Sequence, residues 1–170
     1  TRRMIIWHNG SYKNQSDFSF CLEDRVRFGD GLFETILGVD GKAIFLNPHL
    51  QRLYNGAHAF KIPVPYNEDE LSEAIHDLLK SNNLHHGQTV INLILSRGHA
   101  PRGLMPVDDP DPNMIITVLR APEHYKPLDA ILCRTTRRNE GSGLSRYKTF
   151  CYGDQILALL EAREKGANEA

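Results

Sequence analysis

Cysteine is scarce in this chain of 170 residues, which contains three of them, Cys21, Cys133 and Cys151, and no Cys-x-x-Cys pair. An odd number without paired spacing argues against a disulfide framework and against a zinc site, and it is typical of a reducing cytoplasm. Long apolar runs are also absent, and no segment approaches the ~20 residues that a membrane span requires. The first residues carry charge without a long apolar stretch, so they do not predict a secretory signal.

An excess of one charge sign is missing too. The chain has 20 basic and 21 acidic residues and a formal net charge of −1, so nothing points to a nucleic acid or an anionic membrane as partner. His85 and His86 stand in a predicted loop without further ligands, and such a pair is more often polar loop than metal site. The contents of 41% hydrophobic and 24% charged residues are ordinary for a soluble globular protein.

Two dipeptides mark tight turns between predicted strands. Asn9-Gly10 and Asp40-Gly41 tolerate the positive φ angles of a two-residue hairpin turn. Each predicts a hairpin, and the paired strands are residues 4–7 with 12–13 and 32–39 with 42–46. Ahead of the second hairpin, Gly29-Asp30-Gly31 predicts a turn that opens the strand.

Apolar residues at helical spacing predict three helices. The first is capped by Asn47 with Pro48 as its first residue, the second is capped by Asn67, and the third follows Lys148 and ends near Gly166. Apolar segments predict further strands at 90–95, 114–119 and 130–136. This order of elements predicts an α+β domain at residues 1–120, a linker at 121–127 and the beginning of a second domain at 128–170. A site between the two domains is the expected place for a cofactor.

Lys148 stands between a polar, Gly- and Ser-rich loop, residues 138–146, and the start of the third predicted helix. The partial positive charge of the helix start and three neighbouring arginines, Arg137, Arg138 and Arg146, favour the neutral amine, which is the nucleophilic form. Lysines before helices are also common as solvated surface residues. Local chemistry alone leaves both interpretations open.

Four segments together resemble the class IV aminotransferase family, whose members use pyridoxal 5′-phosphate (PLP). Residues 137–170, with Lys148, Tyr152 and the closing Gly-Ala-Asn-Glu-Ala, resemble the cofactor-lysine segment of the family. The other three segments are DRVRFGDGLFETI at 24–36, NPHLQRL with its H-x-x-R-L motif at 47–53, and SRGHAPRG at 96–103. The resemblance implies the fold of D-amino acid aminotransferases, a homodimer, and a second, mainly β domain that continues beyond residue 170.

The resemblance also implies roles for individual residues. Lys148 would hold PLP covalently, Arg52 would bind its phosphate with a fixed fork of donors, and Tyr152 would contact the cofactor. Arg102, Arg97 and Phe33 would face the substrate, a small carboxylated amine. For Arg97 a position at the rim of the site is an equal alternative, and His49, beside Arg52 on the same helix, is expected to be structural.

Two departures from D-amino acid aminotransferases favour one branch of the family, the 4-amino-4-deoxychorismate lyases. Phe33 stands where those transferases carry a tyrosine that helps to bind the substrate carboxylate, and Leu104 stands where they carry a histidine. The stretch 137–152 also resembles the lyases more than the branched-chain aminotransferases. We therefore expect a lyase that releases pyruvate and forms 4-aminobenzoate for folate synthesis. The alternatives are a branched-chain or D-amino acid aminotransferase and a catalytically incomplete PLP-binding fragment.

Overall fold

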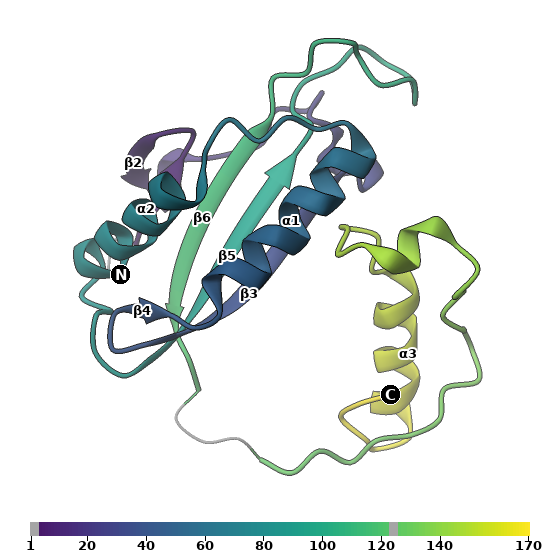
Figure 1. Cartoon of the computed structure of the whole chain (residues 1–170). Coiled ribbons are helices and arrows are strands. Elements are labelled where there is room, and N and C mark those ends of the chain that lie inside the picture. The colour runs from purple at the N-terminus through teal and green to yellow at the C-terminus, as the bar shows by residue number, and fades with distance from the viewer. Residues whose placement is uncertain (1–3, 123–125) are drawn as a thin grey trace.

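All strands of the described residues, 4–122 and 126–170 of this computed structural model, belong to one antiparallel sheet with the order β2-β1-β6-β5-β3-β4. Helices α1 and α2 cover one face of the sheet, and α3 lies to one side after an extended segment (Figure 1). The strands are β1 Ile5–His8, β2 Ser11–Asn14, β3 Gly31–Val39, β4 Lys42–Ala43, β5 Gln88–Ser96 and β6 Asn113–Arg120. The helices are α1 Leu46–Phe60, α2 Glu68–Ser81 and α3 Gly153–Glu164, with short 3-10 helices at Gln15–Asp17, Arg25–Phe28 and Gly143–Arg146. The predicted α+β class is confirmed.

Both predicted hairpins are present, although β4 ends at Ala43 and the predicted strand at 42–46 was too long, because Phe45 caps α1. Asn9 and Gly10 have φ angles of 45° and 83° between β1 and β2, and Asp40 and Gly41 have 47° and 78° between β3 and β4. Positive φ at both central residues gives the turn the twist that joins antiparallel strands. The cap predicted for α2 is also confirmed, because Asn67 and Glu70 form a reciprocal capping box.

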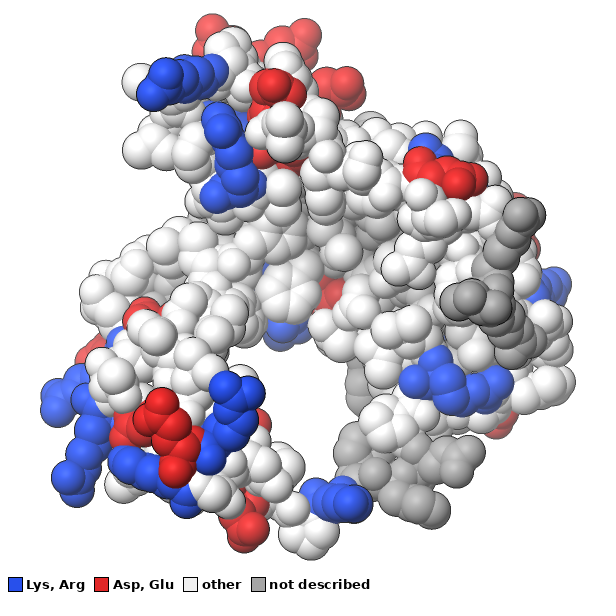
Figure 2. Space-filling view, turned by 180° about the vertical axis from the view of Figure 1, so that it is seen from behind, with Lys and Arg blue, Asp and Glu red and all other residues white. Residues whose placement is uncertain are grey.

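One face of the sheet is buried against α1 and α2. Ile91, Leu93 and Leu95 of β5 lie on this face and belong to the main core cluster. The alternate residues point to the opposite face, where Leu37 and Leu119 are exposed. Figure 2 looks onto that face, and its middle shows few charged side chains. The sheet therefore has one face packed under helices and one partly open face, on which Leu37 and Leu119 are exposed while Ile6 and Ile115 are buried.

The predicted cap of the first helix was wrong. Helix α1 begins at Leu46, and its N-cap is Phe45 in the left-handed conformation, without a side-chain cap. Asn47 lies inside the first turn, and its side-chain amide donates to Glu68 Oε2 of α2 at 2.8 Å. Pro48 is still tolerated, since the first four N–H groups of a helix have no partner within it.

The predicted strand at 130–136 was wrong as well. Ala130 makes an isolated bridge with Glu169, and residues 126–170 contain no longer strand. The amides of Arg134 and Thr135 donate to the carboxylate of Glu161 in α3, each at 2.9 Å. A strand needs a neighbouring strand as hydrogen-bond partner along its length. Here the Glu161 carboxylate accepts these backbone N–H bonds instead.

Helix α3 occupies the predicted segment, but its large apolar side chains are exposed. Ile156, Leu157 and Leu160 are exposed, and Ala162 is buried. No helix of residues 4–122 and 126–170 has the length and apolar character needed to cross a membrane. In the same described ranges, no cluster of three or more His, Cys, Asp or Glu side chains could hold a metal ion.

Candidate active site

The segment that carries Lys148 lies along the first residues of β3. The Phe33 N–H donates to the Lys148 carbonyl at 3.0 Å, and the Phe150 N–H donates to the Gly31 carbonyl at 3.2 Å. Strand β4 pairs only with the far end of β3, so this part of the edge is open to a second partner. The backbone of the predicted cofactor lysine is therefore held by the sheet.

The glycines of the Gly29-Asp30-Gly31 turn permit this close approach. A Cβ on Gly31 would lie 2.5 Å from the Leu95 carbonyl oxygen and would overlap the Phe150 ring. A Cβ on Gly29 would lie 2.7 Å from Cys151 Sγ, and its φ of +73° is left-handed, which favours glycine. The motif thus forms the predicted turn and also leaves room for the lysine segment to pack closely against it.

The amine of Lys148 lies between two aromatic side chains. Its Nζ is 4.0 Å from the centre of the Phe33 ring and donates to Tyr152 Oη at 3.3 Å. The two rings touch edge to face, with centres 5.3 Å apart. A charged amine is attracted by the face of an aromatic ring, and a phenolic oxygen can accept a hydrogen bond from the amine. The structure therefore brings together three of the six predicted site residues.

Arg52 is held by a buried carboxylate. Its Nε and Nη2 donate to the two oxygens of Glu34, both at 2.6 Å, and His49 Nδ1 lies 2.8 Å from Glu34 Oε2. These hydrogen bonds raise the pKa of Arg52, burial opposes them, and the charges of Glu34 and then Tyr152 add to the rise. The side chain of Arg52 is 53% exposed, so part of the guanidinium remains accessible to a ligand.

Glu34 was not among the predicted site residues, although the sequence carries a signal for it. Leu32, Glu34 and Ile36 alternate along β3 and therefore share its buried face. A carboxylate on such a face requires a partner, because an unpaired buried charge is costly. Its partners come from α1, and His49 takes the structural place that the sequence predicted.

The two predicted substrate arginines lie in different surroundings. Arg97 is 3% exposed, and its guanidinium donates to Asp30 and to the carbonyls of Phe60 and Lys61. Arg102 is exposed and lines a hollow of about 530 Å³ together with Arg27. That hollow shares no lining residue with the cavity of about 310 Å³ that Tyr152 and the loop before Lys148 line. The structure thus does not place Arg102 in one pocket with the neighbours of Lys148.

Comparison with known proteins identifies the family. A family model described as amino-transferase class IV matches residues 31–170, and the chain belongs to this family. It is 30% identical over 174 residues to a putative branched-chain-amino-acid aminotransferase of Methanocaldococcus jannaschii, covering 98% of this chain and 58% of the relative. It is 36% identical over 98 residues to a D-alanine aminotransferase of Staphylococcus epidermidis, covering 57% of this chain and 34% of the relative. The predicted family is confirmed.

Solved structures agree in fold. The branched-chain amino acid aminotransferase of Escherichia coli superposes with a TM-score of 0.88 at 23% identity, covering 98% of this chain and 58% of that one. A putative 4-amino-4-deoxychorismate lyase of Legionella pneumophila has a TM-score of 0.79 at 29% identity, covering 91% and 56%. The chain therefore spans a little more than half the length of these proteins.

Proposed function

We propose that the protein containing this chain is a PLP-dependent enzyme that acts on a small carboxylated amine, with Lys148 as the residue that holds the cofactor. The observation that carries the proposal is the position of the Lys148 amine between Phe33 and Tyr152. Arg52 adds an accessible guanidinium that is held by Glu34, the neighbour of Phe33 in β3. PLP is an aldehyde that carries a phosphate. An amine near aromatic rings can bind the aldehyde, and a fixed guanidinium can bind the phosphate.

The described residues fit this cofactor. Arg52 Nε and Nη2 donate to Glu34, which fixes the guanidinium before any ligand arrives and leaves its Nη1 side to donate to a phosphate. When bound, PLP supplies an electron sink for the bonds around the substrate carbon. Lys148 Nζ carries protons to and from that carbon, Tyr152 holds Nζ by a hydrogen bond, and the Phe33 ring excludes water from one side of the amine.

Among the reactions of the family we propose the lyase reaction, in which aminodeoxychorismate gives 4-aminobenzoate and pyruvate. The Phe33 ring beside Lys148 has no hydroxyl for a substrate carboxylate, so this charge has to be taken by an arginine elsewhere. Arg102 is exposed and able to do so. Transamination remains the second candidate, because the relative matched over 98% of this chain is a putative branched-chain aminotransferase.

The test is to supply the full-length protein with aminodeoxychorismate and, separately, with L-branched-chain or D-amino acids plus 2-oxoglutarate. Formation of 4-aminobenzoate and pyruvate that is lost in Arg102→Ala supports the lyase. Glutamate formation without 4-aminobenzoate reverses the order of the two candidates. A protein that takes up PLP and turns over none of these substrates is the incomplete PLP-binding form.

We further propose domain boundaries at residues 120 and 128. We also propose a cytoplasmic homodimer that buries the open face of the sheet. This face carries the exposed, uncharged Leu37 and Leu119. Leu37→Lys combined with Leu119→Lys should lower the mass measured by light scattering to that of one chain. Leu132→Lys, at an exposed position in the segment before α3, is the matched control. A dimer that survives the double substitution contradicts this choice of interface.

A further inference from the structure

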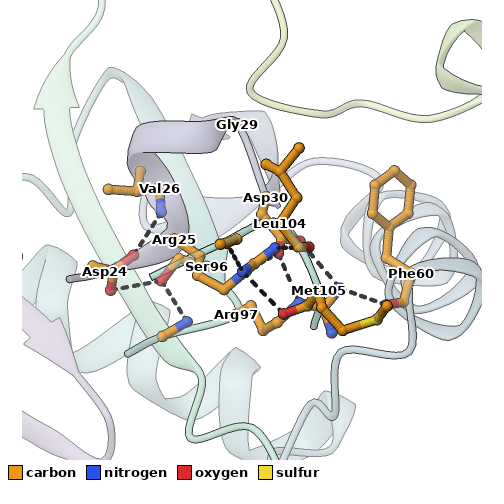
Figure 3. Close-up of polar contacts among 12 residues, drawn as sticks. Asp24, Arg25, Val26, Gly29, Asp30, Phe60, Ser96, Arg97, Leu104 and Met105 are labelled. Carbon is orange, nitrogen blue, oxygen red and sulfur yellow. Dashed lines mark hydrogen bonds and ion pairs between the residues drawn. The ribbon is translucent and has the colours of Figure 1, made fainter. Parts of the chain in front are cut away.

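Two buried arginines share one carboxylate beneath the predicted substrate loop. Asp30 Oδ2 accepts from Arg25 Nε at 2.5 Å and from Arg97 Nε at 2.8 Å, and its Oδ1 accepts from Arg97 Nη2 at 3.1 Å. Figure 3 shows the two guanidinium groups converging on Asp30. Arg25 and Arg97 are 4% and 3% exposed. Burial raises the pKa of Asp30, but the hydrogen bonds from Arg97 and Arg25 outweigh it and hold this pKa below the ordinary value.

The remaining donors of both arginines go to backbone carbonyls. Arg25 Nη2 donates to the Leu104 carbonyl at 2.8 Å, and its Nη1 donates to the Gly103 carbonyl at 3.1 Å (Figure 3 draws the contact with Leu104). Arg97 instead donates to the carbonyls of Phe60 and Lys61 at the end of α1. Neither guanidinium can turn toward a ligand without leaving buried polar groups unpaired.

The turn whose carbonyls accept hydrogen bonds from Arg25 packs little against the rest of the protein. The side chains of Leu104 and Met105 are 73% and 85% exposed, so they do not hold the turn against the body of the protein. The hydrogen bonds from Arg25 to the carbonyls of this turn are therefore a main restraint on the position of the turn. Arg102 directly precedes this turn, and its position depends on that restraint.

Asp30 also lies between the two glycines that seat the Lys148 segment. The Gly31 carbonyl accepts from the Phe150 N–H, and Gly29 packs on Cys151. One turn of three residues thus contacts both the loop of Arg102 and the segment of Lys148. We propose that Asp30 and Arg25 are positioning residues that set Arg102 relative to Lys148, and that Arg97 supports this turn instead of contacting substrate. The inference rests on the proposed function.

The experiment is a double-mutant cycle in the full-length enzyme. Arg25→Lys keeps the charge but loses the fork that spans Asp30 and the carbonyls, and it should raise KM roughly 10–100-fold, the scale of a misplaced binding group. PLP affinity and the visible absorbance should stay at wild-type values, because neither Arg25 nor Asp30 contacts the Lys148 side chain. In the Arg102→Ala background the same substitution should change KM less than two-fold, since no positioned arginine is left to displace.

A purely structural role predicts a different result. Arg25→Lys would then impair both backgrounds equally or lower PLP binding, and either outcome overturns the proposal. Arg120→Lys, an exposed arginine of β6, is the matched control and should leave KM unchanged. If Arg25→Lys does not fold, Asp30→Asn carries the same cycle, and failure of both to fold overturns the positioning role. A wild-type enzyme without PLP binding or turnover refutes the proposed function instead.

Discussion

Replacing Gly31 by alanine should separate the Lys148 segment from the sheet. The new Cβ would lie 2.5 Å from the Leu95 carbonyl oxygen, which belongs to the β3–β5 ladder and cannot move without breaking it. It would also overlap the Phe150 ring, which has to move away and take the segment with it. Overpacking of this kind costs about 1–3 kcal/mol. PLP binding should weaken at the same time, because the displaced residues are next to Lys148.

Urea unfolding followed by circular dichroism measures the stability. With a slope of roughly 1–3 kcal/mol per molar urea, the midpoint should fall by about 1 M. Gly143→Ala is the matched control, because no atom lies within 4 Å of the position of its Cβ. If Gly31→Ala and Gly143→Ala have equal midpoints and equal PLP affinity, the glycine does not act through this close approach.

Three further predictions concern the charged groups. Borohydride reduction of the full-length protein with PLP should leave a pyridoxyl mass on Lys148, and a label on another lysine contradicts the assignment. Arg52→Ala should weaken PLP binding by about 1.5–3 kcal/mol, the scale of hydrogen bonds to a charged group, and Glu34→Gln should weaken it less; an unchanged titration refutes the phosphate role. The lowered pKa of Asp30 means that its ionised form stabilises the fold above the unfolded pKa, and that this contribution is lost as pH falls through the folded pKa. Wild type should therefore lose more stability in acid than Asp30→Asn, and parallel pH profiles of urea unfolding speak against this role.

Much of the local structure followed from the sequence, because its signals act over a few residues. Asn9-Gly10 and Asp40-Gly41 determine their turns through the φ angles that they allow, and the Asn67 cap acts within one helical turn. The family motif supplied Lys148 and Tyr152 four residues apart, a spacing short enough for the hydrogen bond that the structure shows between them. These features need no knowledge of distant partners.

The partners of buried charges were decided only by the tertiary structure. Glu34 meets Arg52 across 18 residues, and Arg97 meets Asp30 across 67, so these pairs depend on how α1 and β5 lie against β3. In the sequence Arg97 and Arg102 look alike, since both stand in one loop rich in arginine and glycine. Burial distinguishes them: a buried guanidinium must spend its donors on internal acceptors, whereas an exposed one keeps them for a ligand.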